Sequence, residues 1–167
     1  MHHEFLDVVD DHDKIIGRCS RPEIHASSLR HRAIHILVFN DHGQLFLQKR
    51  SMKKDLNKGL WDSSAAGHVD ADESYDDCAT RELQEELGIK AELKFLFKLD
   101  ATAELGMEFI QIYKCLHNGP FVFARDEIEE GIWQSLAKVT ERVHDNDPTL
   151  TESFKIIWHH FMQHPNI

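Results

Sequence analysis

Hydrophobic residues occur along the chain in short runs separated by polar turns, which predicts a domain rich in β-strands. The run AIHILVFN, residues 33–40, indicates a buried strand, and QLFLQKRS indicates the strand that returns after a turn at 41–43. An acidic loop at 126–130, and then another short element, are expected later in the chain. Further strands are expected over residues 63–69, 90–101, 108–117 and 121–124.

The apolar residues change to a helical period in a segment rich in glutamate. Ala79, Leu83 and Leu87 recur every four residues, so a helix would present them as one apolar stripe. Residues 70–73 have the spacing of a capping box, with Asp in place of the usual Ser or Thr, and predict the start of this helix. Gly88 suits a left-handed cap at its end.

Both ends of the chain contribute further elements. Residues 150–164 carry large apolar side chains at helical spacing, which predicts a C-terminal helix. Residues 1–29 read as a hairpin followed by a polar connector, and they are too few to fold alone. We therefore expect a short N-terminal β extension packed on a main domain of residues 30–165. Mixed strands with a central and a terminal helix predict an α/β layered domain.

Three glutamates of the predicted central helix suit the binding of a divalent cation. Glu82, Glu85 and Glu86 stand at i, i+3 and i+4, so their carboxylates share about 100° of one helix face. Like charges at this spacing destabilise a helix, whereas hard cations such as Mg²⁺ take carboxylate oxygens as ligands. Arg81, four residues before Glu85, can hold that carboxylate in place. A solvated, charge-rich surface helix is the alternative reading of the same residues.

Composition and charge restrict the class of protein and of partner. The 167 residues suffice for one domain with a core, and 41% hydrophobic residues are ordinary for a globular protein. A net charge of -10 disfavours nucleic-acid polymers and anionic membranes, so an anionic substrate needs a local positive site or a metal. No apolar run approaches a membrane span, and the start lacks a secretory signal. Three widely spaced cysteines favour a reducing, cytoplasmic location.

The stretch GHVDADESYDDCATRELQEELGI, from Gly67 to Ile89, resembles the Nudix box residue for residue. The matching positions are Gly67, Glu73, Arg81, Glu82, Leu83, Glu85, Glu86, Gly88 and Ile89. Similarity to the Nudix family implies the Nudix fold, a mixed β-sheet sandwiched between helices. It also implies hydrolysis of a diphosphate linked to another moiety, with Mg²⁺ or Mn²⁺ as cofactor. Dimers are common in that family, so a homodimer is compatible with the resemblance.

The resemblance also implies roles for individual residues. The implied metal ligands are Glu82, Glu85, Glu86 and the carbonyl of Gly67. Arg81 would orient these acids, and Glu73 would support the site from the first turn of the helix. A divalent ion held there would neutralise phosphate charge and lower the pKa of a bound water. The general base would be either Glu82 or an acid of the loop 126–130, with Glu127 preferred.

A second resemblance lies outside the box, over residues 30–69. This segment is similar to the corresponding region of type 1 isopentenyl-diphosphate isomerases, which share the Nudix fold. Those enzymes use histidine metal ligands; His31 and His68 match two of the positions, and His25 lies near a third. Glu108 stands where the isomerase carries an acid on the strand after the helix, so the resemblance makes it a candidate substrate-binding residue. His68 could bind metal or phosphate, whereas His25 and His31 are equally compatible with structural roles.

Ala66 separates this chain from the isomerase. That enzyme needs a catalytic Cys at the matching position to move a proton, and an alanine side chain has no group for this task. The isomerase also typically departs from the complete box, which this chain keeps. We therefore expect a metal-dependent Nudix hydrolase that cleaves the pyrophosphate linkage of a nucleoside diphosphate derivative or a related diphosphate. An isopentenyl-diphosphate isomerase and a non-catalytic Nudix-fold sensor are the alternatives.

A basic stretch before the box is a candidate edge for receiving phosphate. It contains Lys49, Arg50, Lys53, Lys54 and Lys58. In an otherwise acidic protein these side chains could attract an anionic substrate, and Arg50 is the best candidate for a direct contact. A solvated loop face is the alternative. Trp61, further along, is expected to pack in the core rather than stack on a substrate.

Overall fold

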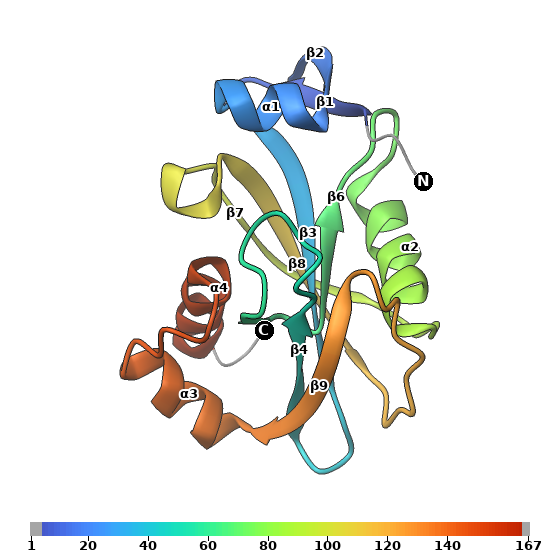
Figure 1. Cartoon of the computed structure of the whole chain (residues 1–167), viewed down its shortest axis with the longest axis vertical. Helices are drawn as coiled ribbons and strands as arrows, with labels where there is room; N and C mark the ends of the chain where they lie inside the picture. The colour runs from blue at the N-terminus through green and yellow to red at the C-terminus, as the bar shows by residue number, and fades with distance from the viewer. Residues whose placement is uncertain (1–4, 165–167) are drawn as a thin grey trace.

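A mixed β-sheet runs through the centre of the molecule, with helices on both of its faces (Figure 1). The computed structural model describes residues 5–164, so His2, His3 and residue 165 lie outside the described part. Within that part, the central sheet contains β3 (His31–Phe39), β4 (Gln44–Arg50), β5 (Trp61–Asp62), β6 (Ala65–His68), β7 (Lys94–Leu99), β8 (Glu108–Leu116) and β9 (Ile128–Ser135).

The helices and a separate hairpin complete the fold. They are β1 (Phe5–Val9), β2 (Ile15–Ser20), α1 (Arg21–Ser27), α2 (Tyr75–Leu87), the short 3-10 helix η1 (Ala103–Leu105), α3 (Leu136–His144) and α4 (Glu152–Gln163). None of the described helices is long and apolar enough to cross a membrane. The predicted α/β architecture, a mixed sheet between helices, is confirmed, and so is the C-terminal helix.

The sheet is built around β3. This strand runs parallel to β8 over its whole length, His31–Phe39, and its other edge pairs antiparallel with β6 over Ala33–Ile36. The turn at 41–43 returns the chain as predicted, but β4 meets β3 only where Phe39 faces Leu45 and then pairs with β9. The two strands therefore diverge, and both contribute side chains to a cleft.

Alternation along β3 divides the hydrophobic core into two layers. Ile34, Ile36 and Val38 pack under α2, where the predicted apolar stripe of that helix is buried. Leu37 belongs to the second layer, which α3 and α4 cover. Trp61 packs against this second layer, as predicted. Because both faces of β3 are covered, its backbone is a firm support for any polar side chain that it carries.

The N-terminal segment forms a small unit beside the sheet (Figure 1). β1 and β2 make the predicted hairpin, but residues 21–27 form a helix where a polar connector was expected. The start signals were present in the sequence, because Ser20 caps this helix and Pro22 lies in its first turn. The backbone N–H of Ala71 donates to the carbonyl of Phe5 at 2.8 Å, which ties the hairpin to the loop before α2.

Helix α2 starts later than its sequence predicted. Ser74 is the N-cap, and its hydroxyl accepts a hydrogen bond from the N–H of Asp77 at 3.0 Å. The predicted capping box at 70–73 instead forms a turn before the helix. In this turn the carboxylate of Glu73 accepts a hydrogen bond from the N–H of Asp70 at 3.0 Å. The error arose because a serine cap and the Asp-Glu pair lie within one turn of each other.

The segment after β8 also differs from the prediction. Residues 121–124 are not a strand, because two of their N–H groups donate to the carbonyls of Leu87 and Glu86, at 3.0 and 3.1 Å. The chain is thus paired with the end of α2 rather than with the sheet. β9 begins at Ile128, so the second half of the expected acidic loop, 126–130, belongs to a strand. The short element that follows is helix α3.

Candidate metal and diphosphate site

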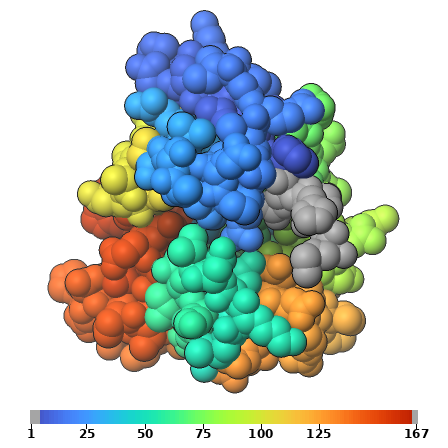
Figure 2. Space-filling model, turned by 45° about the horizontal axis from the view of Figure 1, so that its top comes forward, coloured from blue at the N-terminus to red at the C-terminus, as the bar shows by residue number. Residues whose placement is uncertain are grey.

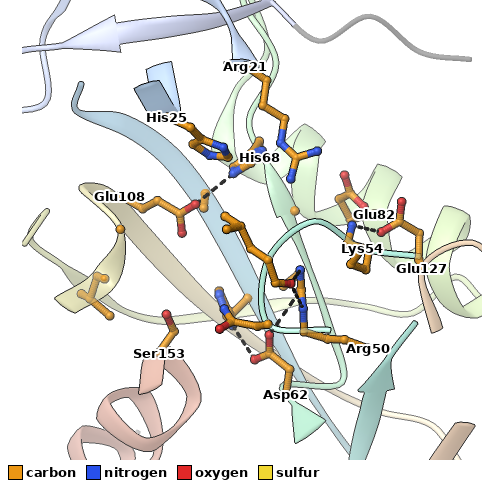
Figure 3. Close-up of a pocket in the computed structure, with 18 of the residues that line it drawn as sticks. Arg21, His25, Arg50, Lys54, Asp62, His68, Glu82, Glu108, Glu127 and Ser153 are labelled. Atoms are coloured by element: carbon orange, nitrogen blue, oxygen red, sulfur yellow. Dashed lines mark hydrogen bonds and ion pairs between the residues drawn. The ribbon is translucent and has the colours of Figure 1, made fainter. Parts of the chain in front are cut away.

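Helix α2 presents its three glutamates to a cleft of about 930 Å³. Glu82 and Glu86 are buried, at 8% and 5% exposure, whereas the side chain of Glu85 is exposed at the rim. Gly88 ends the helix in the left-handed conformation, with φ 69°, as predicted. The three carboxylates therefore share one wall of the cleft, where Figure 3 shows Glu82.

Arg81 gathers the acids around one guanidinium group. It binds the carboxylate of Glu73 through two N–H groups, at 2.7 and 2.9 Å. Its Nη1 donates to Glu82 at 2.9 Å and to Glu85 at 3.1 Å. Its Nη2 also reaches the carbonyl of His68 at 3.2 Å. The planar guanidinium of arginine, with its several N–H donors, suits these contacts. They join β6, the turn before α2 and α2 itself.

Glu86 is held by uncharged donors. Its Oε1 accepts from the backbone N–H of Ala66 at 3.1 Å and from the side-chain amide of Gln48 at 3.0 Å. Gln48 is buried on β4, and its amide also donates to the carbonyl of Ser64 at 3.3 Å. Neutral donors orient the carboxylate without cancelling its charge, which leaves that charge available to a cation. Sequence reasoning missed Gln48, because only the β4–β6 arrangement brings it to the helix.

Burial makes the charged forms of these carboxylates costly in the absence of a cation. Burial raises the pKa of Glu82 to about 7, with a further rise from the charge of Glu85, although Arg81 opposes both. Burial and the charge of Glu82 raise the pKa of Glu86 well above its usual range. A bound divalent cation would reverse these effects. Carboxylate oxygens are also the ligands that Mg²⁺ and Mn²⁺ prefer, so the residues present fit such an ion.

We expect the metal-free protein to lose stability relative to its Glu82→Gln variant as pH rises. The folded-state pKa of Glu82, about 7, lies above the ordinary value of 4.5, so folding favours the protonated acid. This stabilisation, up to about 3 kcal/mol, is complete at low pH and disappears as the pH rises through about 7. Melting temperatures of both proteins, with a chelator and then with Mg²⁺, check this. Mg²⁺ should raise the wild-type melting temperature most at high pH, and parallel curves would contradict the assignment.

Gly67 is required because β6 passes directly beside Glu82. A Cβ atom at position 67 would overlap the carboxyl group of Glu82, so a side chain there must displace that carboxylate from Arg81. We expect Gly67→Ala to lower kcat/KM by about 10- to 100-fold with only a few degrees' change in Tm. Gly17→Ala is the control, because a Cβ there meets only Val8, at 4.0 Å. Equal activity of the two variants would show that Glu82 tolerates the displacement.

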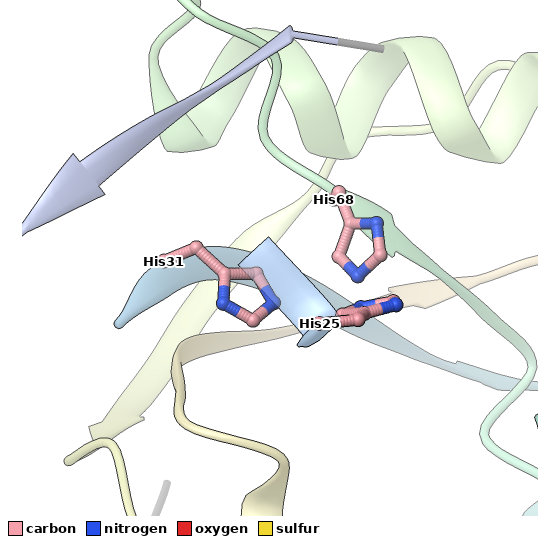
Figure 4. A group of neighbouring side chains, drawn as sticks. All are labelled: His25, His31 and His68. Atoms are coloured by element: carbon pink, nitrogen blue, oxygen red, sulfur yellow. The ribbon is translucent and has the colours of Figure 1, made fainter. Parts of the chain in front are cut away.

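Three histidines meet beside the cleft, which two of them, His25 and His68, line (Figure 4). His25 comes from α1, His31 from β3 and His68 from β6, and one ring nitrogen of each lies within 4.8 Å of the others. Glu108 on β8 joins them: its Oε2 lies 2.9 Å from Nε2 of His68 and 3.3 Å from Nε2 of His31. The structure thus brings together the histidine group predicted from the sequence, and Glu108 belongs to it.

His31 is oriented as a metal ligand would be. Its Nδ1 lies 2.9 Å from the carbonyl of Leu29, and because a carbonyl only accepts, Nδ1 carries the proton. Its Nε2 is buried and makes no hydrogen bond within residues 5–164. Burial, and then the neighbouring His68, lower the pKa of His25, which keeps that ring neutral. Imidazole nitrogens beside a carboxylate suit a transition metal or zinc.

The predicted basic stretch is largely paired with acids that follow residue 125. The ion pairs are Lys49–Glu129 at 3.6 Å, Lys53–Asp126 at 3.2 Å and Lys54–Glu127. The contacts of Lys53 and Lys54 fasten the loop 51–60 to the segment before β9, and the contact of Lys49 joins β4 to β9. The stretch is therefore not an open positive edge, although Lys54 and Glu127 both line the cleft (Figure 3).

Two arginines approach the cleft from different elements. Arg50 donates twice to the carbonyl of Leu56, at 3.1 and 2.9 Å, and its Nη1 lies 3.7 Å from Asp62. Arg21, at the start of α1, donates to Asp55 at 3.3 Å. Figure 2 shows the blue N-terminal segment lying against the teal loop where these residues meet. Arg21 and Asp62 were not predicted, because their places depend on an unexpected helix and on a two-residue strand.

The comparisons with known proteins agree with the fold and the box. A NUDIX domain model matches residues 29–154. The chain is 33% identical over 154 residues to the Nudix hydrolase YfcD of Escherichia coli K12, covering 87% of this chain and 81% of YfcD. It is 35% identical over 159 residues to an isopentenyl-diphosphate Delta-isomerase of Serratia proteamaculans, covering 92% of this chain and 89% of that protein.

Solved structures show the same fold. DR0079 from Deinococcus radiodurans superposes with a TM-score of 0.84 at 23% identity, covering 94% of this chain and 98% of that one. A MutT protein from Methanosarcina mazei Go1 has a TM-score of 0.69 at 23% identity, covering 81% of this chain and 94% of that one. Together with the domain match and the complete box on α2, these similarities establish that the chain belongs to the Nudix hydrolase family.

Proposed function

We propose that this Nudix hydrolase cleaves the pyrophosphate linkage of a nucleoside diphosphate derivative or a related small-molecule diphosphate. The observation that carries the proposal is the pair of buried carboxylates, Glu82 and Glu86, in a cleft that also contains basic side chains. With Glu85 and the carbonyl of Gly67, they would hold a divalent cation, Mg²⁺ or Mn²⁺. When bound, such a cation neutralises phosphate charge and lowers the pKa of a coordinated water.

Glu127 is the group that we propose as general base. It lines the cleft near Glu82, its carboxylate is held by Lys54, and its side chain is 41% exposed, so water can reach it (Figure 3). A carboxylate in this place can accept the proton of the attacking water. Glu82 is the alternative base. Glu127→Gln should therefore lower kcat more than KM, and an unchanged kcat would leave the role to Glu82.

The remaining residues would position the acids and the substrate. Arg81 orients Glu82 and Glu85 through its hydrogen bonds, while Glu73 fixes the guanidinium from the other side. Arg50 would contact a phosphate oxygen, because arginine recognises phosphate well and this one already lines the cleft. This contact requires the substrate to compete with the carbonyl that Arg50 now binds.

We also propose a second metal site at His25, His31 and His68, with Glu108 as the carboxylate partner. It is supported most directly by the buried Nε2 of His31, which makes no hydrogen bond within residues 5–164 and lies 3.3 Å from Oε2 of Glu108. This site can be tested without measuring turnover. When the chelator-treated proteins are titrated with Zn²⁺ or Mn²⁺, His31→Ala should show one binding event fewer than the wild type. The N-terminal residues 1–29 would then be an extension that completes the cleft of the domain at 30–165, because α1 supplies His25.

An isopentenyl-diphosphate isomerase is the second candidate. The histidine group and the Serratia relative favour it. Ala66 weighs against it, because this residue lines the cleft where the isomerase-like reaction needs a thiol. Cys78 and Cys115 are buried in the core layer under α2 and cannot replace that thiol. Incubation of isopentenyl diphosphate with protein and metal, followed by proton NMR, decides the matter: dimethylallyl diphosphate would support the isomerase.

A panel of diphosphates tests the hydrolase directly. Nucleoside diphosphate sugars, dinucleotides, diphosphate-containing cofactors and isoprenoid diphosphates should be incubated with Mg²⁺ or Mn²⁺ and assayed for phosphate or monophosphate release. We expect turnover of at least one class, lost on chelation and restored by metal. Binding of a diphosphate without turnover of any class would instead favour a non-catalytic sensor.

A further inference from the structure

His35 is a buried histidine of the cleft that neither the Nudix box nor the histidine group includes. It lies on β3, is 5% exposed and lines the cleft. The β3–β6 pairing sets it opposite Ala66, whose N–H binds Glu86. Residues directly opposite in an antiparallel pair project to the same face, with Cβ atoms roughly 5 Å apart. The side chains of His35 and Ala66 therefore project from the same face of the β3–β6 pair, and both residues line the cleft.

A network behind the ring holds His35 in one orientation. Its Nδ1 lies 2.8 Å from the hydroxyl oxygen of Ser63 and 3.9 Å from the carboxylate of Asp62. Asp62 is itself fixed by the N–H of Ser63 at 2.7 Å and the hydroxyl of Thr151 at 3.1 Å. The same carboxylate lies 3.7 Å from Arg50, so Arg50 and His35 stand side by side around it.

The hydrogen-bond partners of Ser63 determine which ring nitrogen of His35 carries the proton. Ser63 is fully buried, and within residues 5–164 its hydroxyl has no acceptor other than Nδ1 of His35. If Nδ1 donated, the hydroxyl proton would be buried without a partner, which is costly. Ser63 therefore donates to Nδ1, and the proton of the neutral ring is on Nε2. Nε2 forms no hydrogen bond with the described residues and is not sealed from the cleft.

We propose that the Nε2–H of His35 donates a hydrogen bond to an oxygen of the substrate's diphosphate, next to the contact made by Arg50. His35 would then be a substrate-positioning and specificity-determining residue outside the box. A neutral N–H donor fits a phosphate oxygen without adding another charge to a site that already has arginine and a cation. This inference rests on the proposed function, because it takes the cleft to be the diphosphate site.

The test uses the full-length protein with Mg²⁺ and methylenediphosphonate, a diphosphate analogue that cannot be hydrolysed. In nitrogen-15 NMR of the imidazole rings, His35 should be neutral and protonated on Nε2, and its Nε2 resonance should move on addition of the analogue. A proton on Nδ1, or no binding of the analogue to the wild type, would overturn the proposal. So would binding that leaves the ring resonances unchanged. These measurements need no substituted protein beyond a variant used for assignment.

Affinity measurements give an independent readout. His35→Phe should weaken binding of the analogue by about 3- to 10-fold, the range for one neutral hydrogen bond, and His35→Gln should recover part of the loss. Ser63→Ala keeps the imidazole but frees it to rotate, so an intermediate loss is expected. His144→Phe, an exposed histidine on α3, is the matched control. Wild-type affinity in His35→Phe would refute the contact. Diphosphate binding that depends on His35 without hydrolysis of any panel substrate would refute the proposed function alone.

Discussion

Replacement of Glu86 by Gln is expected to lower kcat on the order of 10³-fold without unfolding the protein. The substitution removes the charge of a buried carboxylate that we propose as a metal ligand. It keeps the oxygen that accepts from Ala66 and Gln48, so the local hydrogen bonds survive. Because burial raises the pKa of Glu86, the charge costs stability in the metal-free protein. The variant should therefore melt at or above the wild-type temperature in a chelator.

The matched control for this experiment is Glu92→Gln, an exposed glutamate on the loop after α2. It should leave both kcat and the melting temperature unchanged. Titration with Mn²⁺ should also show weaker metal binding in Glu86→Gln than in the control. Near-normal turnover of Glu86→Gln would remove this carboxylate from the catalytic machinery. A large fall in melting temperature would instead show that its charge is structural.

Arg81→Lys is expected to lower kcat/KM by about 100-fold and to destabilise the fold by about 2 kcal/mol. Lysine keeps the positive charge but cannot bind Glu73 with two N–H groups while reaching Glu82 and Glu85. Glu82 would lose its fixed position at the cleft, and its burial would no longer be offset by the adjacent guanidinium. Kinetics and thermal unfolding of the same preparation measure both effects.

Arg142→Lys separates the two effects. Arg142 also binds several partners, Asp147 at 2.8 Å, Gln134 at 2.7 Å and Thr149 at 3.1 Å, but it does not line the cleft. Its substitution should cost a similar stability with little change in kcat/KM. If both variants lost activity only in proportion to their stability, Arg81 would be a structural residue and not an organiser of the site.

The carboxylate wall of the cleft could be predicted from the sequence because its residues lie close together along the chain. The three glutamates, Arg81 and the cap at Gly88 belong to one helix, where the period of 3.6 residues fixes their relative positions. The apolar stripe of α2 could be identified for the same reason. The histidine group was also identified, but only through resemblance, because α1, β3 and β6 meet by folding and not by sequence spacing.

Other parts of the cleft could not be predicted because they depend on strand pairing. The hairpin signal at 41–43 suggested that β3 and β4 stay together, yet β4 leaves to pair with β9. That divergence brings Gln48 to Glu86 and Arg50 to Asp62. No local period encodes these contacts, since register is decided by burial over the whole sheet.

The ion pairs at the rim of the cleft also could not be predicted from the sequence. From the sequence, the lysines around Arg50 formed a candidate phosphate-receiving edge, and the acids at 126–130 formed a separate loop that offered a candidate general base. In the fold the two segments pair, including Lys54 with Glu127. Charge alone could not reveal this, because segments separated by some seventy residues acquire their contact only through the tertiary structure. The pairing is also what gives Glu127 a fixed place beside Glu82.

The most direct test of the central claim is phosphorus NMR of a turnover reaction in heavy-oxygen water. With Mg²⁺ and a substrate from the panel, the wild type should convert the diphosphate resonances into monophosphate resonances. One product should carry the isotope shift of the new oxygen, which shows attack of water on phosphorus. Glu86→Gln should show neither change over the same time. A diphosphate that stays intact in every reaction, or equal cleavage by the variant, would contradict a metal-dependent hydrolase built on α2.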